Sequence, residues 1–182
     1  MPRNSTPVPT GKYVRLVQLS PLVLKALGDG DIAAARLGAA IAFSDYLVGP
    51  ESRSVWRRRA LQIVEDPSSA PWITRAVIDA DNGAVVGRAG FHGPPDDRDM
   101  VEVGYAIDPA FRRQGYARAA LVALLKSAKD EPSVRTVRAT TSPGNIASRA
   151  LIADYGFVQV GEQWDDEDGL EIIFEVEAKR SI

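Results

Sequence analysis

The spacing of apolar and polar residues changes sharply near the middle of the chain. Residues 101–107 alternate large apolar side chains with smaller or polar ones, which predicts a strand that Asp108 and Pro109 end. Apolar residues then recur at steps of three and four, which predicts an amphipathic helix over residues 114–129. Its apolar stripe consists of Ala117, Ala120, Leu121, Leu124, Leu125 and Ala128.

The same two periods recur on both sides of this junction. Strands are predicted over residues 13–19, 72–79, 84–91, 134–140, 157–163 and 170–177, and helices over residues 21–27, 31–42, 51–65 and 145–155. Asp81, Asn82 and Gly83 form a strong hairpin signal. This order of elements predicts an α/β fold with one sheet of mixed strand direction. Without an internal repeat or linker, we expect a flexible proline-rich tail over residues 1–12 and one domain over residues 13–182.

Composition narrows the classes of function. The chain has 182 residues, of which 45% are hydrophobic, enough for a substantial core. Its 22 basic and 24 acidic residues nearly cancel, so no net field favours nucleic acid. The absence of cysteine excludes disulfides, thiolate metal sites and a cysteine nucleophile, and the single histidine excludes a histidine-rich metal centre. Because no apolar run could span a bilayer and no signal peptide is visible, we expect no membrane partner and a cytoplasmic protein.

The turn between the central strand and helix is suited to a phosphate. The first amides of a helix lack intrahelical acceptors, and the peptide dipoles favour an anion there. Gly115 would let the backbone approach such a ligand, and Arg112, Arg113 and Arg118 surround the turn with positive charge. The alternative is an ordinary tight turn with solvated arginines.

The spacing Arg112-x-x-Gly115-x-Ala117 resembles the pyrophosphate-binding motif of the GCN5-related N-acetyltransferases. In that family the motif reads Arg or Gln, two residues, Gly, one residue, then Gly or Ala. A second family segment follows at the expected distance, with Asn145, Ile146, Ala147, Ser148, Leu151, Gly156 and Phe157. Residues 101–105, Val-Glu-Val-Gly-Tyr, also resemble the central strand of the subgroup that acetylates N-terminal amines of ribosomal proteins. The resemblance is clear over residues 85–176.

The resemblance implies a fold and a cofactor, acetyl-CoA. The expected fold is a single domain with a mixed, mostly antiparallel sheet of about seven strands, flanked by helices. A V-shaped splay should separate the strand at 101–108 from that at 134–140, and the pantetheine arm should lie between them. By this resemblance, the backbone of Ala106 and Ile107 meets the pantetheine and Asn145 meets the cofactor near its middle. The pyrophosphate site would comprise Arg112, Arg113, Gln114, Gly115, Tyr116 and Ala117. Independently, Glu102, Gly104 and Ala106 share one face of the strand, where the two small residues leave room for an approaching group or a packed helix.

Several residues are candidates for proton transfer. Glu102 lies inside an apolar strand, which would suit its carboxylate to act as a base, directly or through water, although it could equally be structural. By resemblance, Ser148 protonates the departing thiolate; the alternative is a hydrogen bond at the helix start. Many family members carry a tyrosine where this chain has Ile152, so a tyrosine general acid at this position is excluded. Tyr155 is expected to pack against its neighbours. His92 is suited to proton transfer or is an ordinary loop residue.

Two runs of charged residues could be either ordinary solvated surface or part of a binding site. Residues 165–168 are all acidic and are expected to form a solvated hairpin tip that could attract a cationic amine. Residues 57–59 are three arginines, most simply a solvated helix face, whose charge could instead touch a nucleotide phosphate or an acidic partner.

Together these features predict an acetyl-CoA-dependent N-acetyltransferase in which the amine attacks directly in a ternary complex. The absent cysteine argues against a covalent acyl-enzyme. The favoured acceptor is the N-terminal amine of a protein or peptide. The alternatives are a small-molecule amine such as an antibiotic, polyamine or amino acid, a non-catalytic acyl-CoA sensor, and an unrelated α/β domain whose Arg-Gly turn is accidental. A homodimer stays open because no heptad or long apolar strip marks an interface.

Overall fold

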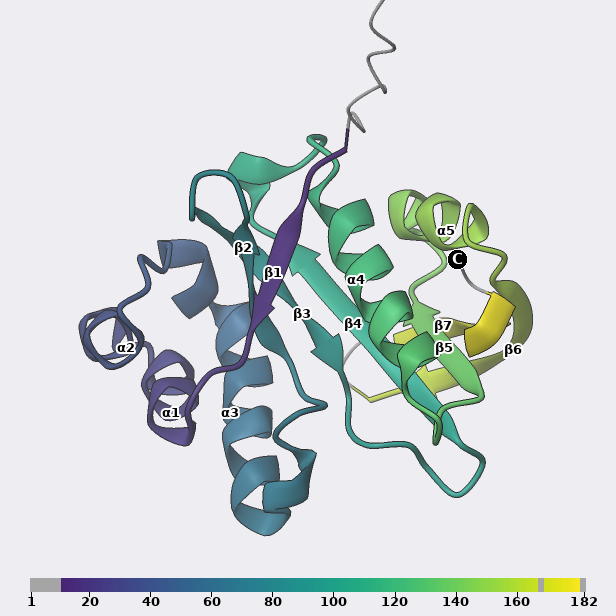
Figure 1. Cartoon of the computed structure of the whole chain (residues 1–182), viewed down its shortest axis with the longest axis horizontal. Coiled ribbons are helices and arrows are strands. Elements are labelled where there is room, and N and C mark those ends of the chain that lie inside the picture. The colour runs from purple at the N-terminus through teal and green to yellow at the C-terminus, as the bar shows by residue number, and fades with distance from the viewer. Residues whose placement is uncertain (1–10, 167–168, 181–182) are drawn as a thin grey trace, which may run out of the picture.

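A seven-stranded sheet forms the centre of the protein (Figure 1). The computed structural model describes residues 11–166 and 169–180, so all but the last two residues of the predicted tail lie outside the described part. Along the sheet the strands follow the order β1-β2-β3-β4-β5-β7-β6. Their bounds are β1 Val14–Val17, β2 Arg75–Asp79, β3 Val85–Phe91, β4 Met100–Ile107, β5 Thr136–Thr141, β6 Val158–Asp165 and β7 Gly169–Glu177. Among the described strands, only β4 and β5 pair in parallel, which confirms the predicted mixed, mostly antiparallel sheet.

In the described part of the chain, five α-helices flank this sheet (Figure 1). Their bounds are α1 Pro21–Asp29, α2 Ile32–Ala39, α3 Pro50–Glu65, α4 Tyr116–Asp130 and α5 Ile146–Ala153. Ser20 and Asp31 cap α1 and α2 through their side-chain oxygens. No helix in the described part of the chain is both long and apolar enough to cross a membrane.

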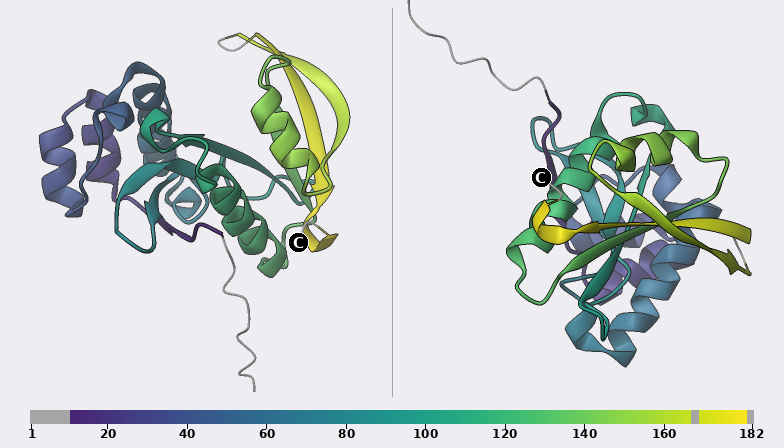
Figure 2. Two further views of the ribbon diagram at one scale, coloured as in Figure 1. Left: turned by 90° about the horizontal axis from the view of Figure 1, so that it is seen from above. Right: turned by 90° about the vertical axis from the view of Figure 1, so that its right-hand side faces the viewer.

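The sheet opens between β4 and β5. Their pairing covers only Met100 to Glu102 against Thr136 to Arg138, although β4 runs on to Ile107 and β5 to Thr141. The two halves of the sheet therefore diverge, as the left panel of Figure 2 shows. This is the predicted splay, and beyond Glu102 that edge of β4 pairs with no strand in the described chain.

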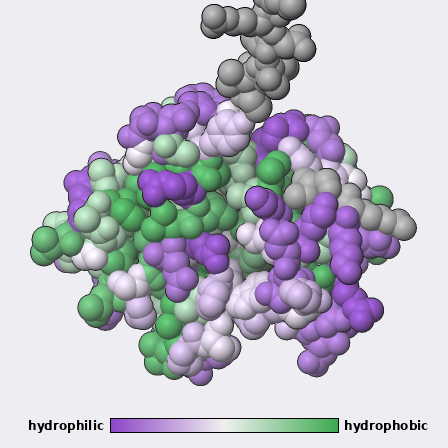
Figure 3. Space-filling view, viewed as in Figure 1, coloured by the Kyte–Doolittle hydropathy of each residue, from purple (hydrophilic) through white to green (hydrophobic). Residues whose placement is uncertain are grey.

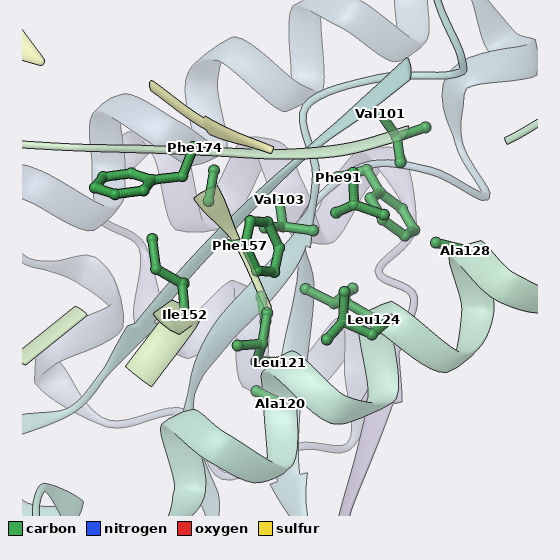
Figure 4. Packing of buried hydrophobic residues seen from close by; sticks show 14 of the residues in the cluster. Phe91, Val101, Val103, Ala120, Leu121, Leu124, Ala128, Ile152, Phe157 and Phe174 are labelled. Atoms are coloured by element: carbon green, nitrogen blue, oxygen red, sulfur yellow. The ribbon is translucent and has the colours of Figure 1, made fainter. Parts of the chain in front are cut away.

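Alternation along β2 separates two cores. Val77 faces a cluster built mainly on β4, β5 and α4, whereas its neighbours Ala76 and Ile78 face a cluster with α1 and α3. In the first cluster, Leu121 and Leu124 of α4 point toward Val103 of β4 (Figure 4). The helices α3 and α4 therefore cover opposite faces of the sheet. On the surface view, hydrophilic side chains predominate on the right-hand half, and apolar ones gather to the left of β1 (Figure 3).

Several boundaries differ from the prediction. The loop at 44–50 contains a 3-10 helix, Asp45–Val48, and another, Pro109–Phe111, precedes the phosphate turn. The helix α4 begins at Tyr116 rather than at residue 114, because Arg113 and Gly115 both have positive φ angles that interrupt the helix. Helix α2 ends at Ala39, where Ala40 turns into the left-handed region. The spacing of apolar residues along the chain does not predict these local turns.

Candidate active site

One cavity of about 660 Å³ lies where the phosphate turn, the open edge of β4 and the start of α5 meet. Most of the predicted cofactor residues line it, from Ala106 through the turn to Asn145. Its walls comprise Tyr46, Glu51, Tyr105, Ala106, Ile107, Phe111, Arg112, Arg113, Gly115, Tyr116, Ala117, Arg118, Asn145, Ala147, Ser148 and Leu151. Among the predicted residues, the side chain of Gln114 turns away to donate to the carbonyl of Ala110, and Glu102 lies outside the lining.

Hydrogen bonds from neighbouring residues fix the conformation of the phosphate turn. Asp108 accepts the amide of Ala110 at 3.0 Å and the hydroxyl of Ser44 at 2.6 Å, and Arg112 Nε donates to the carbonyl of Ile107 at 3.0 Å. Gly115 has φ +90°, a conformation that a side chain disfavours. No side chain caps α4, so the amides at its N-terminus face the cavity end without a capping acceptor from the described protein. This geometry fits a bound phosphate group.

A buried carboxylate anchors the start of α4. The Tyr116 hydroxyl donates to Asp79, whose side chain is fully buried, and Lys12 lies 3.3 Å from the same oxygen. The hydrogen bond from Tyr116, then the amide of Asp81 and then Lys12 lower the pKa of Asp79 to about 2. Lys12, which the prediction assigned to the tail, also lies 4.9 Å from the centre of the Tyr116 ring. It thereby places a positive charge beside the turn.

Tyr105 meets Ser148 at the other end of the cavity. Their hydroxyl oxygens are 2.9 Å apart, and both residues are half-buried. Burial raises the pKa of Tyr105, an effect that the hydrogen bond with Ser148 partly opposes. Ser148 also donates its amide to Asn145 at 3.1 Å, so the predicted helix-start contact is present, in the form of an Asn145 cap.

The sequence interpretation missed Tyr105. Position 152 holds a fully buried isoleucine, and the tyrosine in the cavity comes from β4 instead. Strand alternation could have placed Tyr105 on the face opposite Glu102. It could not have shown that α5 brings Ser148 against it.

Glu102 lies on the opposite face of β4, beside the only histidine. Thr140 of β5 donates to its Oε1 at 2.6 Å across the splay, and His92 Nδ1 lies 3.6 Å from the same oxygen. The room expected above Gly104 is taken, because a Cβ there would lie 2.8 Å from His92 Nε2. A histidine ring, rather than an approaching ligand or a helix, therefore explains this glycine.

The electrostatic surroundings of His92 are mixed. Its side chain is 45% exposed, yet the enclosing protein atoms lower its pKa by desolvation. The Glu102 carboxylate raises that pKa, while three arginines, Arg59, Arg58 and Arg88, lower it further. Lowering of its pKa favours a neutral imidazole, which can accept a proton.

The arginine run at 57–59 is not solvated throughout. Arg59 is only 5% exposed and donates through Nη1 to the carbonyl of His92 and to Gln62. Burial lowers the pKa of Arg59 to about 10. The prediction of a fully solvated face is therefore wrong for this residue, because α3 turns it toward the sheet.

A model of the acetyltransferase (GNAT) domain matches residues 22–158. The chain belongs to the GNAT acetyltransferase family. Among curated proteins, it is 32% identical over 87 residues to the uncharacterized N-acetyltransferase YjdG of Bacillus subtilis (strain 168). That match covers 48% of this chain and spans only 50% of YjdG.

Solved structures of GNAT proteins share the whole fold. The ribosomal-protein α-N-acetyltransferase RimL in complex with coenzyme A is similar with a TM-score of 0.64 and 15% identity, covering 94% of this chain and 98% of RimL. A mutant form of the spermidine N-acetyltransferase SpeG from Vibrio cholerae gives a TM-score of 0.64 and 14% identity, covering 93% of this GNAT chain and 96% of SpeG. At such identities the likeness concerns the fold alone.

Proposed function

We propose that this GNAT protein is an acetyl-CoA-dependent N-acetyltransferase that transfers the acetyl group to a primary amine in a ternary complex. One observation carries the proposal: a single cavity joins the uncapped N-terminus of α4 to the open edge of β4 and to the Tyr105–Ser148 pair. A phosphate group, an extended arm and a reacting end need these three environments in this order. Acetyl-CoA would supply an activated acetyl thioester.

The cofactor site is proposed on the residues that line this cavity. The amides from Arg113 to Ala117, with the charge of Arg112, would bind the pyrophosphate. At Ala106 and Ile107, the edge of β4 that faces away from β3 pairs with no described strand and would bind the arm as a further strand does, and Asn145 would contact it from α5.

The two faces of β4 would divide the proton transfers. On one face, Glu102 and the neighbouring His92 would accept the proton that the attacking amine loses when its nitrogen bonds the acetyl carbon. On the other face, Tyr105 with Ser148 would donate a proton to the sulfur as the carbon–sulfur bond breaks. Holding the reactants between these groups would itself lower the barrier, because proximity replaces a bimolecular encounter.

For the acceptor we favour the N-terminal amine of a protein or peptide. The Val-Glu-Val-Gly-Tyr strand and the Asn-x-x-Ser segment support this choice. The structural neighbour RimL is named as a ribosomal-protein α-N-acetyltransferase, which also supports it. SpeG, another neighbour, is named for spermidine, so a small-molecule amine is the second candidate. A cytoplasmic location and a homodimer stay predictions.

Calorimetric titration with acetyl-CoA tests the proposal first, with NAD and adenosine 3′,5′-bisphosphate as controls. We expect micromolar binding of acetyl-CoA and acetyl transfer to amines in a following screen. Binding without transfer to any amine would favour a sensor, and no binding at all would remove both functions.

The phosphate turn has a direct test in Gly115→Asp. This change places a carboxylate against the proposed pyrophosphate site and should abolish binding of acetyl-CoA. Gly83→Asp is a matched control, because Gly83 also has a positive φ, +75°, but lies in the β2–β3 hairpin with no atom within 4 Å of an added Cβ. Undiminished binding by Gly115→Asp would contradict the assignment of this turn.

A further inference from the structure

Positive charge dominates the face of β4 on which the proposed base lies. Arg59 and Arg88, neither of which forms an ion pair with a described carboxylate, lower the pKa of His92, whereas Glu102 raises it. Neighbouring charges act on Arg59 in the same way. Arg58 and Arg88 lower the pKa of Arg59, and Glu102 raises it. An acceptor that binds on this face therefore meets a net positive environment.

Arg88 has side-chain donors that no group in the described part of the chain accepts. It lies on β3 directly opposite Ala106, which lines the cavity, and its Nε donates to Ser52 Oγ at 3.4 Å. Within the described part of the chain, its side chain makes no other hydrogen bond and no ion pair with a carboxylate. Burial lowers its pKa, and Tyr46 and Glu51, both in the cavity wall, raise it. The terminal nitrogens of Arg88 thus have no acceptor in the described part of the chain, and Arg88 itself lies outside the cavity lining.

A half-buried guanidinium without a carboxylate partner is costly for the protein, since desolvation is not offset by an opposite charge. Its planar fork matches a carboxylate through two parallel hydrogen bonds. We propose that Arg88 binds a carboxylate of the acceptor, and that the acceptor is a peptide with an acidic side chain close behind its N-terminal amine. This inference rests on the proposed acetyl transfer and names the acceptor class of that same site.

The spacing of the site favours a peptide over a free amino acid. The amine must lie near Glu102 and His92, whereas Arg88 is level with Ala106, four residues further along β4. Four residues of a strand span roughly 13 Å. The amine and carboxylate of a single α-amino acid are separated by one carbon atom, which is short compared with this backbone span. An aspartate or glutamate at the second or third position of a peptide would supply a more distant carboxylate.

The same charges disfavour a polyamine. A polyamine carries further ammonium groups next to the reacting nitrogen, and these would be repelled by Arg59 and Arg88. One acid, Glu51, lies in the cavity wall near Arg88 and is exposed. Its removal should strengthen the selection for acidic acceptors.

Steady-state acetylation of matched acceptors tests this inference on the full-length protein. The panel is a set of peptides identical except for aspartate, asparagine or lysine at positions two and three, together with spermidine and free aspartate. We expect kcat/KM to be about tenfold or more higher for the acidic peptide than for the neutral one, the scale of a charge-assisted hydrogen bond. The lysine peptide, spermidine and free aspartate should be the poorest acceptors.

Variants then assign the preference to Arg88. Arg88→Gln, which retains a donor for Ser52, should raise KM for the acidic peptide about tenfold more than KM for the neutral peptide. Arg88→Lys should restore part of the preference, because it keeps the charge without the fork. Glu51→Gln should increase the preference. Arg135→Gln is the matched control, since this arginine is 80% exposed and pairs with Asp99 elsewhere on the surface.

The outcomes separate the two proposals. Equal transfer to acidic and neutral peptides, or a preference for spermidine, would overturn the inference about Arg88 while acetyl transfer stands. Loss of activity toward all peptides in Arg88→Gln would also overturn it, because it would indicate a general structural role. No transfer to any amine would overturn the proposed function together with this inference.

Discussion

Tyr105 and Ser148 have complementary positions although 43 residues separate them in the chain. Each side chain alone has an ordinary explanation: Tyr105 belongs to a half-buried strand and Ser148 follows the cap of a helix. Their contact at the cavity wall makes them a candidate proton-donating pair, in place of a tyrosine at position 152.

Removal of either hydroxyl should slow acetyl transfer. We expect Tyr105→Phe and Ser148→Ala each to lower kcat about 100-fold, the lower range for general acid catalysis, with little change in the KM for acetyl-CoA. If the two residues act as a unit, the double variant should be no slower than the slower single variant. Steady-state kinetics checks this, with Tyr13→Phe as a control at an exposed tyrosine. Additive losses in the double variant would contradict a shared proton.

His92 offers a direct probe of the charges on the other face of β4. As the only histidine of the chain, its ring signals in an NMR titration are unambiguous. We expect a pKa below the ordinary value, a further decrease in Glu102→Gln, which removes the charge that raises it, and an increase in Arg88→Gln. Arg135→Gln should leave the titration unchanged. A rise of the His92 pKa in Glu102→Gln would refute the described pairing.

Elements position these side chains through a few anchors. The start of α4 is fastened to β2 by the hydrogen bond from Tyr116 to Asp79, and the preceding turn is fastened to β4 by Arg112 and Asp108. Because the N-terminus of α4 forms the proposed phosphate site, the anchor on β2 serves the site as well as the fold.

This anchor should make stability depend on pH in a defined window. The pKa of Asp79 is about 2 in the folded protein, below its ordinary value of about 4, so the ionised carboxylate stabilises the fold above pH 4. That contribution should be lost as the pH falls from about 4 to about 2. Thermal unfolding across this range should show the loss in the natural protein and a smaller dependence in Asp79→Asn.

A surface pair provides the comparison. Asp29→Asn removes an exposed ion pair with Lys25, where solvent screening leaves little net energy, so its pH dependence should match the natural protein. An unchanged acid response in Asp79→Asn would mean that other carboxylates dominate this range.

At the scale of the whole molecule, the cavity spans both halves of the divided sheet. Its walls come from β4 and α4 on one side and from α5 on the other. A ligand that fills the cavity therefore bridges parts that, beyond Glu102, have no strand pairing between them.

Binding of acetyl-CoA should accordingly raise the melting temperature. At 100 times its dissociation constant, a ligand stabilises the folded state by about 2.7 kcal/mol. For a protein of this size, that corresponds to a shift of roughly 5–10 °C. Differential scanning calorimetry with acetyl-CoA, and with NAD as the control, measures it. A shift with NAD but none with acetyl-CoA would contradict the assignment of the cavity.

Local patterns in the sequence determined most of the elements and the phosphate turn. The period of the apolar residues identified β4 and α4, because this signal depends on neighbours within a few residues. The spacing of Arg112, Gly115 and Ala117 led to the correct family, although the roles of these residues stay predictions.

The tertiary structure alone decided which residues share a face of the site. Periodicity could not show that His92 occupies the space above Gly104, that α3 buries Arg59, or that Ser148 meets Tyr105. These contacts join elements far apart in the chain, and they depend on strand register and on the direction in which each helix packs. The arginines near His92 and the guanidinium nitrogens of Arg88 without an acceptor result from the same packing, so no local sequence pattern predicted them.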